Sequence, residues 1–488
     1  MNKPYLFLVC TFLFALLHPL LGQEENTSTK SHEIKVNGKK LKYETKTGFM
    51  PITNDTGHVI ANVFYIAYTK SGSDKNRPIT FSFNGGPGSS SVWLHLGALG
   101  PHRVKMKDDK GEKTAPPFEL VENEYTWLEE TDLVFIDPVS TGYSHAEPHQ
   151  NSKDFHGYSE DVQSVGKFIR HYIHDNNRWR SPKYLVGESY GTTRASGLSN
   201  HLQSRYGMEL NGIMLISMVT NFQTLMSHDG NDLPHMLFLP TFAASAHYHG
   251  KLAKKYQSMP LKDFLAEVED FAMNDYLVAL VKGNQLDEQE RTDLAKKLAD
   301  YTGLSEKYIT QSNFRLTTGE YAKELLRDES LTIGRFDSRY TGTDKADHKQ
   351  YYDYDPSYAV VYGPYATLIN DYFINNLGFQ ESSRPYEILT GKVRPWNYKQ
   401  FTNRYVNNTD EMRKAMAQNP YLKIWVAAGY YDLATPYLAA EYSMNHLDYK
   451  GDYKDRIHFT YYEAGHMMYT HKASLKALFE DFKHFIQD

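Results

Sequence analysis

A serine at position 189 stands between two glycines in the segment GESYG, residues 187–191. The apolar run KYLVG leads into it, and the helix-like stretch TTRASGLSNHL follows. Flanking glycines permit a sharp turn from strand to helix that points the serine hydroxyl outward, as a nucleophile requires. These five residues alone also fit an ordinary glycine turn, so the rest of the sequence decides between the two interpretations.

Asp432 and His466 are the residues that could activate such a serine. A serine nucleophile needs a base to accept its proton and an acid to orient that base, and the fold brings them together. Asp432 follows the apolar run KIWVAAG, and His466 follows HFTYY. Both stand at the ends of predicted strands, where open sheets carry their functional side chains. The order Ser, Asp, His is one of the known triad orders.

A glycine-rich loop, Asn84 to Gly88, could supply a third part of the site. It reads NGGPG and follows a predicted strand that begins at Ile79. Acyl transfer develops negative charge on the former carbonyl oxygen, and glycines let backbone N–H groups approach that oxygen closely. The alternative is a plain Gly/Pro turn. A phosphate-binding loop does not fit, because the required Lys-Ser/Thr ending is missing.

Short apolar runs separated by helix-like spans must position these residues. Nearly all-apolar strands that alternate with helices predict a mainly parallel sheet with helices on both faces. Before them, two alternating runs flank Asn37-Gly38, which predicts a β-hairpin. The apolar runs are ITFSF from Ile79, LVFID from Leu133, KYLVG from Lys183, GIMLIS from Gly212, KIWVAAG from Lys423 and HFTYY from His458.

The chain changes character between residues 225 and 355, which predicts an inserted, mostly helical cap. In LKDFLAEVEDFA, residues 261–272, the apolar side chains fall on one helix face, and the charges indicate a solvated face. We therefore predict that residues 33–224 and 356–488 form the two parts of an α/β core. A helix from about Ala473 closes the chain.

Residues 1–22 have the pattern of a secretory signal peptide. A charged start at Lys3 precedes the apolar run PYLFLVCTFLFALLHPLL and a small-residue boundary near Gly22. An uncleaved membrane anchor is the alternative, because the run approaches the roughly 20 residues that a spanning helix needs. His18-Pro19 favours cleavage. The single cysteine, Cys10, lies in this segment, so the exported chain would contain no disulfide.

Charge and histidine spacing argue against two classes of function. The 488 residues include 59 Asp plus Glu against 53 Lys plus Arg, without a basic block that could follow a phosphate backbone. Nucleic acid is therefore not an expected partner. His171 and His174, and His247 and His249, are closely spaced, but no third ligand or His-Glu-x-x-His pattern accompanies them. We expect ordinary surface histidines there, and no metal or other cofactor.

Taken together, the motifs resemble those of the serine carboxypeptidases of the α/β-hydrolase superfamily. They occur in the family's order over nearly the whole chain outside the cap. The resemblance rests on NGGPGSSS at 84–91, LGP at 99–101, IDPVSTGYS at 136–144, GESYG at 187–191, Asp432 in its loop and AGHM at 464–467.

The resemblance implies a role for each candidate residue. Ser189 would be the nucleophile, His466 the base and then the acid, and Asp432 the group that orients His466. The implied binding groups are the backbone N–H groups of Gly86 and Tyr190 for the oxyanion, Asn84, Gly85 and Glu188 for the free C-terminal carboxylate of the substrate, and Met467 for the pocket of the leaving residue.

Glu188 would give this reaction a pH dependence. An ionised Glu188 would repel a substrate carboxylate, whereas a protonated Glu188 could donate a hydrogen bond to it. Substrate binding should therefore favour acidic solution. We expect peptide hydrolysis with a preference for mildly acid pH.

Ala98 and Ser89 are among the positions that depart from the family pattern. Many relatives carry a second glutamate that is hydrogen-bonded to the first, but Ala98 stands at that position here, and Ser89 replaces a half-cystine. Three alternatives follow. Asn84, Gly85 and Glu188 suffice, or another polar group from the cap compensates, or the enzyme recognises something other than a free C-terminus.

The expected function is that of an exported serine carboxypeptidase that acts on peptides or proteins through an acyl-enzyme. An esterase or acyltransferase could use the same triad, because the fold does not dictate the acyl donor. A catalytically silent binding protein on this scaffold is a third alternative. Export would lead to the periplasm or the medium in a bacterium and to a secretory or lysosome-like compartment in a eukaryote, without stable membrane insertion after signal cleavage.

Overall fold

The structure is a computed structural model that describes residues 27–107, 112–447 and 450–487. The predicted signal peptide, residues 1–22, lies outside the described residues, and Cys10 lies there with it. Within the described ranges, no helix combines the length and the apolar character that crossing a membrane would need.

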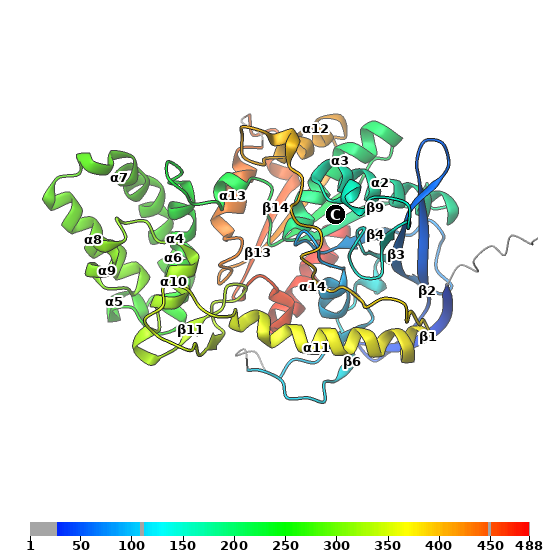
Figure 1. The fold of residues 1–488 in the computed structure, drawn as a ribbon, viewed down its shortest axis with the longest axis horizontal. Helices are drawn as coiled ribbons and strands as arrows, with labels where there is room; N and C mark the ends of the chain where they lie inside the picture. The colour runs from blue at the N-terminus through cyan, green and yellow to red at the C-terminus, as the bar shows by residue number, and fades with distance from the viewer. Residues whose placement is uncertain (1–26, 108–111, 448–449, 488) are drawn as a thin grey trace, which may run out of the picture.

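A ten-stranded sheet forms the centre of the molecule (Figure 1). Its strand order is β1-β2-β3-β7-β4-β9-β10-β13-β14, and β8 pairs with β3. The strands from β7 to β14 in this order run parallel, and the first three join antiparallel at one edge. The bounds are β1 Ser28–Val36, β2 Lys39–Thr53, β3 Val59–Lys70, β4 Ile79–Phe83, β7 Asp132–Ile136, β8 His145–Ala146, β9 Lys183–Glu188, β10 Gly212–Ile216, β13 Lys423–Gly429 and β14 Ile457–Tyr462.

The predicted strands are present. Each of the six apolar runs forms a strand of the parallel part of the sheet, with bounds that agree within one residue. The predicted hairpin is also confirmed: Val36 pairs with Lys39, and the two turn residues Asn37 and Gly38 have positive φ values of 49° and 77°. That turn matches the twist of the two strands. Two short pairs lie outside the main sheet: β5 His102–Val104 with β6 Leu120–Glu122, and β11 Thr332–Ile333 with β12 Thr341–Gly342.

Helices cover both faces of the sheet. Alternate strand residues enter two separate cores: Phe81 and Leu185 face one, and Phe135 and Val186 face the other. The first core is closed by α2 Tyr158–Asp175, α3 Tyr190–Tyr206 and α12 Thr409–Gln418, and the second by α1 Val92–Leu94, α11 Pro356–Tyr372 and α14 Lys472–Gln487. This arrangement confirms the predicted α/β-hydrolase fold with a mainly parallel sheet.

A helical lobe lies beside the sheet and forms the predicted cap (Figure 1, green). It has a core of its own, to which α6 contributes Phe264, Leu265, Val268 and Phe271. The cap boundaries at 225 and 355, and the core parts 33–224 and 356–488, stay predictions. The helices of the lobe are α4 Leu233–Tyr248, α5 Lys254–Gln257, α6 Leu261–Phe271, α7 Leu277–Lys282, α8 Glu288–Thr302, α9 Glu306–Gln311 and α10 Thr318–Glu324, and α13 Tyr437–Asn445 packs against them.

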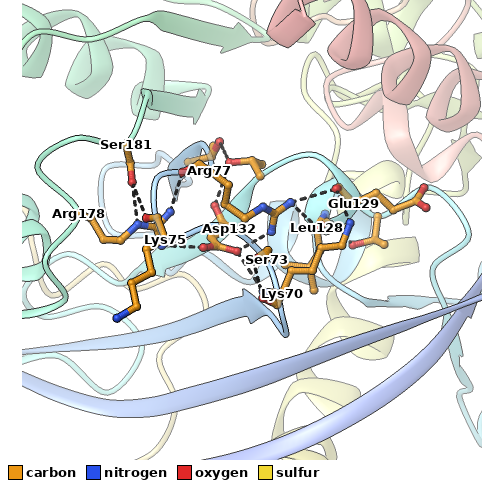
Figure 2. A network of polar contacts seen from close by, with 12 residues as sticks. Lys70, Ser73, Lys75, Arg77, Leu128, Glu129, Asp132, Arg178 and Ser181 are labelled. Atoms are coloured by element: carbon orange, nitrogen blue, oxygen red, sulfur yellow. Dashed lines mark hydrogen bonds and ion pairs between the residues drawn. The ribbon is translucent and has the colours of Figure 1, made fainter.

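A buried ion network fixes the amino ends of the parallel strands (Figure 2). Asp132, at the start of β7, accepts a hydrogen bond from Arg77 at 2.6 Å and another from Arg178 at 2.6 Å. Other donors of the two arginines bind backbone carbonyls and the Ser181 hydroxyl. Both carboxylate oxygens of Asp132 are thus paired with a guanidinium group. The network lies at the amino ends of the parallel strands, whereas Ser189, Asp432 and His466 follow the carboxyl ends.

Candidate active site

Ser189 stands at the turn between β9 and α3. Its φ of 58° and ψ of −129° define a backbone conformation that residues with side chains rarely adopt. The turn is tight: a Cβ at Gly187 would lie 2.2 Å from the Gly191 carbonyl oxygen, and a Cβ at Gly191 would lie 2.7 Å from that of Phe83. Only glycine fits these two positions. The turn therefore has the geometry of a nucleophile elbow.

His466 and Asp432 bind each other at the ends of two neighbouring strands. Nδ1 of His466 lies 2.7 Å from Oδ2 of Asp432, and both side chains are buried. Asp432 follows β13 and His466 follows β14, and these strands pair in parallel. Burial alone would lower the pKa of the imidazole, but the adjacent Asp432 carboxylate outweighs burial and raises the pKa of His466. The imidazole is therefore a stronger proton acceptor than a free histidine.

Thr435 fixes the orientation of Asp432. The Asp432 carboxylate accepts hydrogen bonds from the backbone N–H groups of Ala434 at 2.7 Å and Thr435 at 3.0 Å, and from the Thr435 hydroxyl at 2.7 Å. On the other side, the Ser217 hydroxyl donates to the His466 carbonyl oxygen at 2.7 Å. These bonds leave Asp432 one orientation, with Oδ2 toward the imidazole.

One cavity of about 420 Å³ contains Ser189 and His466. It opens at the carboxyl ends of the parallel strands, where α/β sheets bind their ligands. Asp432 does not line it, because Asp432 is completely buried behind His466. The other predicted site residues that line the cavity are Asn84, Gly85, Gly86, Glu188 and Met467.

The glycine-rich loop packs directly on the elbow. A Cβ at Gly85 would lie 2.4 Å from the backbone nitrogen of Tyr190 and 2.8 Å from the carbonyl oxygen of Glu188. Gly86 has a φ of 103°, which also favours glycine. Tyr190 is the first residue of α3, so its N–H has no acceptor inside the helix. The backbone of the loop and the start of the helix therefore meet beside Ser189.

Glu188 is a buried carboxyl group at the floor of the cavity. Its side chain accepts hydrogen bonds from Asn84 Nδ2 at 3.0 Å and from the Tyr469 hydroxyl at 2.6 Å, and the residue is 4% exposed. Burial raises the pKa of Glu188 to about 7, although both donors and the nearby His466 act in the opposite direction. Glu188 is therefore mostly protonated in mildly acid solution.

Tyr469 lies beside the segment that contains Ala98 and contacts Glu188. Ala98 is buried and does not line the cavity, and a Cβ at its neighbour Gly97 would lie 2.4 Å from the Tyr469 ring. The ring thus occupies the space beside Gly97, and its hydroxyl reaches Glu188. Glu188 therefore has a second polar partner, which comes from the segment after His466, and the three alternatives for recognition at this place stay predictions.

His247 and His249, one of the two closely spaced pairs, contact backbone carbonyl groups. Nε2 of His247 lies 3.1 Å from the Met259 carbonyl oxygen, and Nε2 of His249 lies 2.7 Å from that of Ser338. Across the ranges that the structure describes, no group of three or more His, Cys, Asp and Glu side chains is placed to hold a metal ion.

The comparison with known families agrees with the motifs. Residues 35–482 match the family model for serine carboxypeptidase. The chain belongs to the serine carboxypeptidase family. Its fold is similar to the crystal structure of a prohormone-processing carboxypeptidase from Saccharomyces cerevisiae, with a TM-score of 0.58 and 15% identity over 90% of this chain and 91% of the other.

Similarity to curated members of the family covers shorter segments. Serine carboxypeptidase-like 19 of Arabidopsis thaliana is 29% identical over 154 residues, which are 31% of this chain and 31% of the relative. Vitellogenic carboxypeptidase of Aedes aegypti is 28% identical over 182 residues, which are 36% of this chain and 34% of the relative. The matched part spans about a third of the length of these relatives.

Sequence reasoning missed several residues of the site, among them Tyr469, Thr435, Arg335 and Arg394. Tyr469 stands three residues after His466, and Thr435 stands three residues after Asp432. The spacing of Asp432 and Thr435 is the signal that could have identified a threonine that hydrogen-bonds this carboxylate. Arg335 and Arg394 also line the cavity, but they lie in loops without a motif. Only the folded chain brings these two arginines to the cavity.

Proposed function

We propose that this protein is an exported serine carboxypeptidase that removes the C-terminal residue of peptides through an acyl-enzyme and works best in acid solution. The observation that carries the proposal is the shared cavity: Ser189 and His466 line it together with Glu188, a carboxyl group with a raised pKa. A hydrolase whose substrate has no free carboxylate next to the scissile bond does not need a protonated carboxyl group at this place.

The first half of the reaction forms the acyl-enzyme. The Ser189 Oγ attacks the carbonyl carbon of the last peptide bond while Nε2 of His466 accepts the hydroxyl proton. Backbone N–H groups of Gly86 and Tyr190 bind the negative oxygen of the tetrahedral intermediate. His466 then gives its proton to the amine nitrogen, the C–N bond breaks, and the last residue leaves as a free amino acid.

The second half repeats these steps with water. His466 accepts a proton from a water molecule, the resulting hydroxide attacks the acyl carbon, and the proton returns to Ser189 Oγ as the ester bond breaks. Asp432 holds the Nδ1–H of His466 through both halves and stabilises the imidazolium that forms twice. The shortened peptide leaves with a new carboxylate.

Glu188 sets the alkaline limit. The protonated carboxyl group donates a hydrogen bond to the substrate carboxylate, and Asn84 and Gly85 bind the same carboxylate. Because this function needs the protonated form, binding is lost as pH rises through the Glu188 pKa of about 7. His466 must be neutral to act as a base. The ionised Glu188 carboxylate is one of the groups that raise the His466 pKa, so protonation of Glu188 removes this contribution and favours the neutral imidazole in acid solution. The active form carries its proton on Glu188 and not on His466.

Export is the part of the proposal that rests on residues 1–22. These residues lie outside the described ranges, and their pattern predicts cleavage near Gly22. The mass of the native protein purified from its host tests this directly. A mature N-terminus after Gly22 is the expected result, and an intact N-terminus in the membrane fraction would favour the anchor alternative.

Paired peptides test the activity. Purified protein is incubated with the same peptide as free acid and as C-terminal amide across pH, and shortening by single residues is followed by mass spectrometry. We expect stepwise shortening of the free acid below neutrality and little of the amide. Equal rates on both would contradict free-carboxylate recognition and favour an esterase or acyltransferase.

Ser189→Ala is the matched control for that experiment. A triad that acts as a unit loses at least about ten-thousandfold in turnover without its nucleophile. Unchanged shortening by the folded variant would show that the activity comes from another group or a contaminant.

A further inference from the structure

Two arginines stand at the mouth of the cavity that contains Ser189. Arg335 lies between β11 and β12, and Arg394 lies in the loop that precedes α12. Both residues are exposed, whereas Glu188 at the floor is buried. A substrate that enters the cavity must therefore pass both guanidinium groups.

Neither guanidinium group forms an ion pair with a residue in the described ranges. The acids near Arg335 are already bound. Asp337 pairs with Arg339 at 2.6 Å and accepts a hydrogen bond from the backbone of Gly465. Asp355 caps α11 and accepts from the backbone N–H of Arg335 itself at 3.1 Å. The charges of the two arginines are thus available to a substrate.

The cavity is positively charged although the chain is not. Of the described residues that line it, Glu188 is the sole acid, and burial raises its pKa to about 7, so it is neutral in acid solution. Arg335 and Arg394 then leave two positive charges at the mouth, in a chain with a formal net charge of −6. A site of this sign attracts anionic groups.

Arg335 lies on the side of the leaving residue. The adjacent Phe336 ring is 5.0 Å from the His466 imidazole, and the Phe336 carbonyl oxygen accepts a hydrogen bond from the His466 backbone at 2.5 Å. His466 passes its proton to the departing amine, so the leaving residue must lie beside this segment.

Arg394 belongs to a loop that packs on the other part of the site. The backbone N–H of Thr390 donates to the Gly88 carbonyl oxygen at 2.9 Å, and the Trp396 indole donates to the Tyr190 hydroxyl at 2.9 Å. Arg394 therefore stands next to the oxyanion loop and to the residue that follows the nucleophile. Because Arg335 stands on the side of the departing amine, we assign this other side to the acyl part of the substrate, and the second peptide set tests the assignment.

We propose that Arg335 and Arg394 bind substrate carboxylates on the two sides of the scissile bond, so that the protein prefers peptides with Asp or Glu in the last two positions. The inference rests on the proposed carboxypeptidase function and names its substrate class. Arginine presents paired N–H donors that match a carboxylate. The leaving residue carries an α-carboxylate and, in Asp or Glu, a side-chain carboxylate, and Arg335 could bind either. The experiment below distinguishes the two carboxylates.

Two sets of free-acid peptides test the inference. One set differs only in the last residue, Glu, Gln or Lys, and the other only in the residue before it. At about pH 5.5 the glutamate side chain is ionised, because its ordinary pKa is about 4.3. We expect a kcat/KM about tenfold higher for Glu than for Gln in each set, lower values for Lys, and a smaller preference in about 0.5 M salt, which screens exposed charges.

Variants assign each preference to one arginine. Arg335→Gln should bring the Glu/Gln ratio at the last position close to one, and Arg335→Glu should reverse it in favour of Lys. Arg394→Gln should act in the same way at the position before. Arg180→Gln is the matched control, because Arg180 is exposed and precedes the amino end of β9, whereas the cavity opens at the carboxyl ends of the strands. It should leave both ratios unchanged.

The outcomes separate this inference from the proposed function. If Arg335→Gln lowers kcat/KM equally for all three last residues, Arg335 binds the α-carboxylate and the inferred preference for an acidic last residue is wrong. If the wild-type protein cleaves Glu and Gln peptides equally and neither variant changes kcat/KM, the inference is wrong and the carboxypeptidase function stands. If no free-acid peptide is shortened, both are wrong.

Discussion

Replacing Tyr469 by Phe tests how the protein controls Glu188. The Tyr469 hydroxyl donates a hydrogen bond to Oε2 of Glu188 at 2.6 Å and stabilises its ionised form. A hydrogen bond to a charged group contributes about 1.5–3 kcal/mol, and one pKa unit corresponds to about 1.4 kcal/mol. Loss of the hydroxyl should therefore raise the pKa of Glu188 by roughly one unit or more.

The direction in which the pH profile moves follows from the protonation state of Glu188 that binds substrate. Because the protonated Glu188 binds the substrate carboxylate, a higher pKa extends activity to higher pH. The alkaline limb of the kcat/KM profile of Tyr469→Phe should therefore move up by roughly one pH unit. The acid limb, which His466 sets, should move much less.

Profiles of kcat/KM against pH, measured on one free-acid peptide, provide the assay. Tyr365→Phe is the matched control, because this tyrosine is buried close to Glu188 and the described contacts include no hydrogen bond between them. Its alkaline limb should stay in place. An unmoved limb in Tyr469→Phe, or a limb that moves to lower pH, would refute the assignment of that limb to Glu188.

Three further substitutions test other parts of the site and the fold. Gly85→Ala would place a Cβ 2.4 Å from the Tyr190 nitrogen, displace the oxyanion loop and lower kcat about a hundredfold or more. Gly363→Ala is the control and should leave kcat unchanged, because its Cβ would meet its nearest neighbour at 3.6 Å. Asp432→Asn should lower kcat by about ten-thousandfold, because an amide no longer holds the imidazole in its working tautomer; a loss below tenfold would contradict the triad. Asp132→Asn leaves the buried Arg178 and the largely buried Arg77 around a neutral group. It should lower the free energy of unfolding by about 3–5 kcal/mol, measured by denaturation, and an unchanged stability would show that the network in Figure 2 is dispensable.

The sequence predicts the parallel sheet well because its strands are buried on both faces. Such strands are short and nearly all apolar, as ITFSF and KIWVAAG are, and they stand out between helical patterns. The glycine-flanked serine and the order of Ser189, Asp432 and His466 then place three polar groups at strand ends. These signals are local, so they can be read without the fold.

Tyr469 and the two arginines could not be predicted in this way. The hydroxyl of Tyr469 reaches Glu188 because Gly97, far away in the sequence, leaves space for the ring. Arg335 and Arg394 lie in loops whose paths are set by contacts with His466 and with the oxyanion loop. Their positions depend on tertiary packing, which periodicity and motif spacing do not describe.

The central claim is that His466 and Asp432 activate Ser189 as a nucleophile. A fluorophosphonate probe, followed by peptide mapping, measures this reactivity directly. We expect one covalent adduct, located on Ser189, and its absence in Ser189→Ala and in a folded His466→Ala variant. A folded wild-type protein that takes up no label, or takes it up on another residue, would contradict the account.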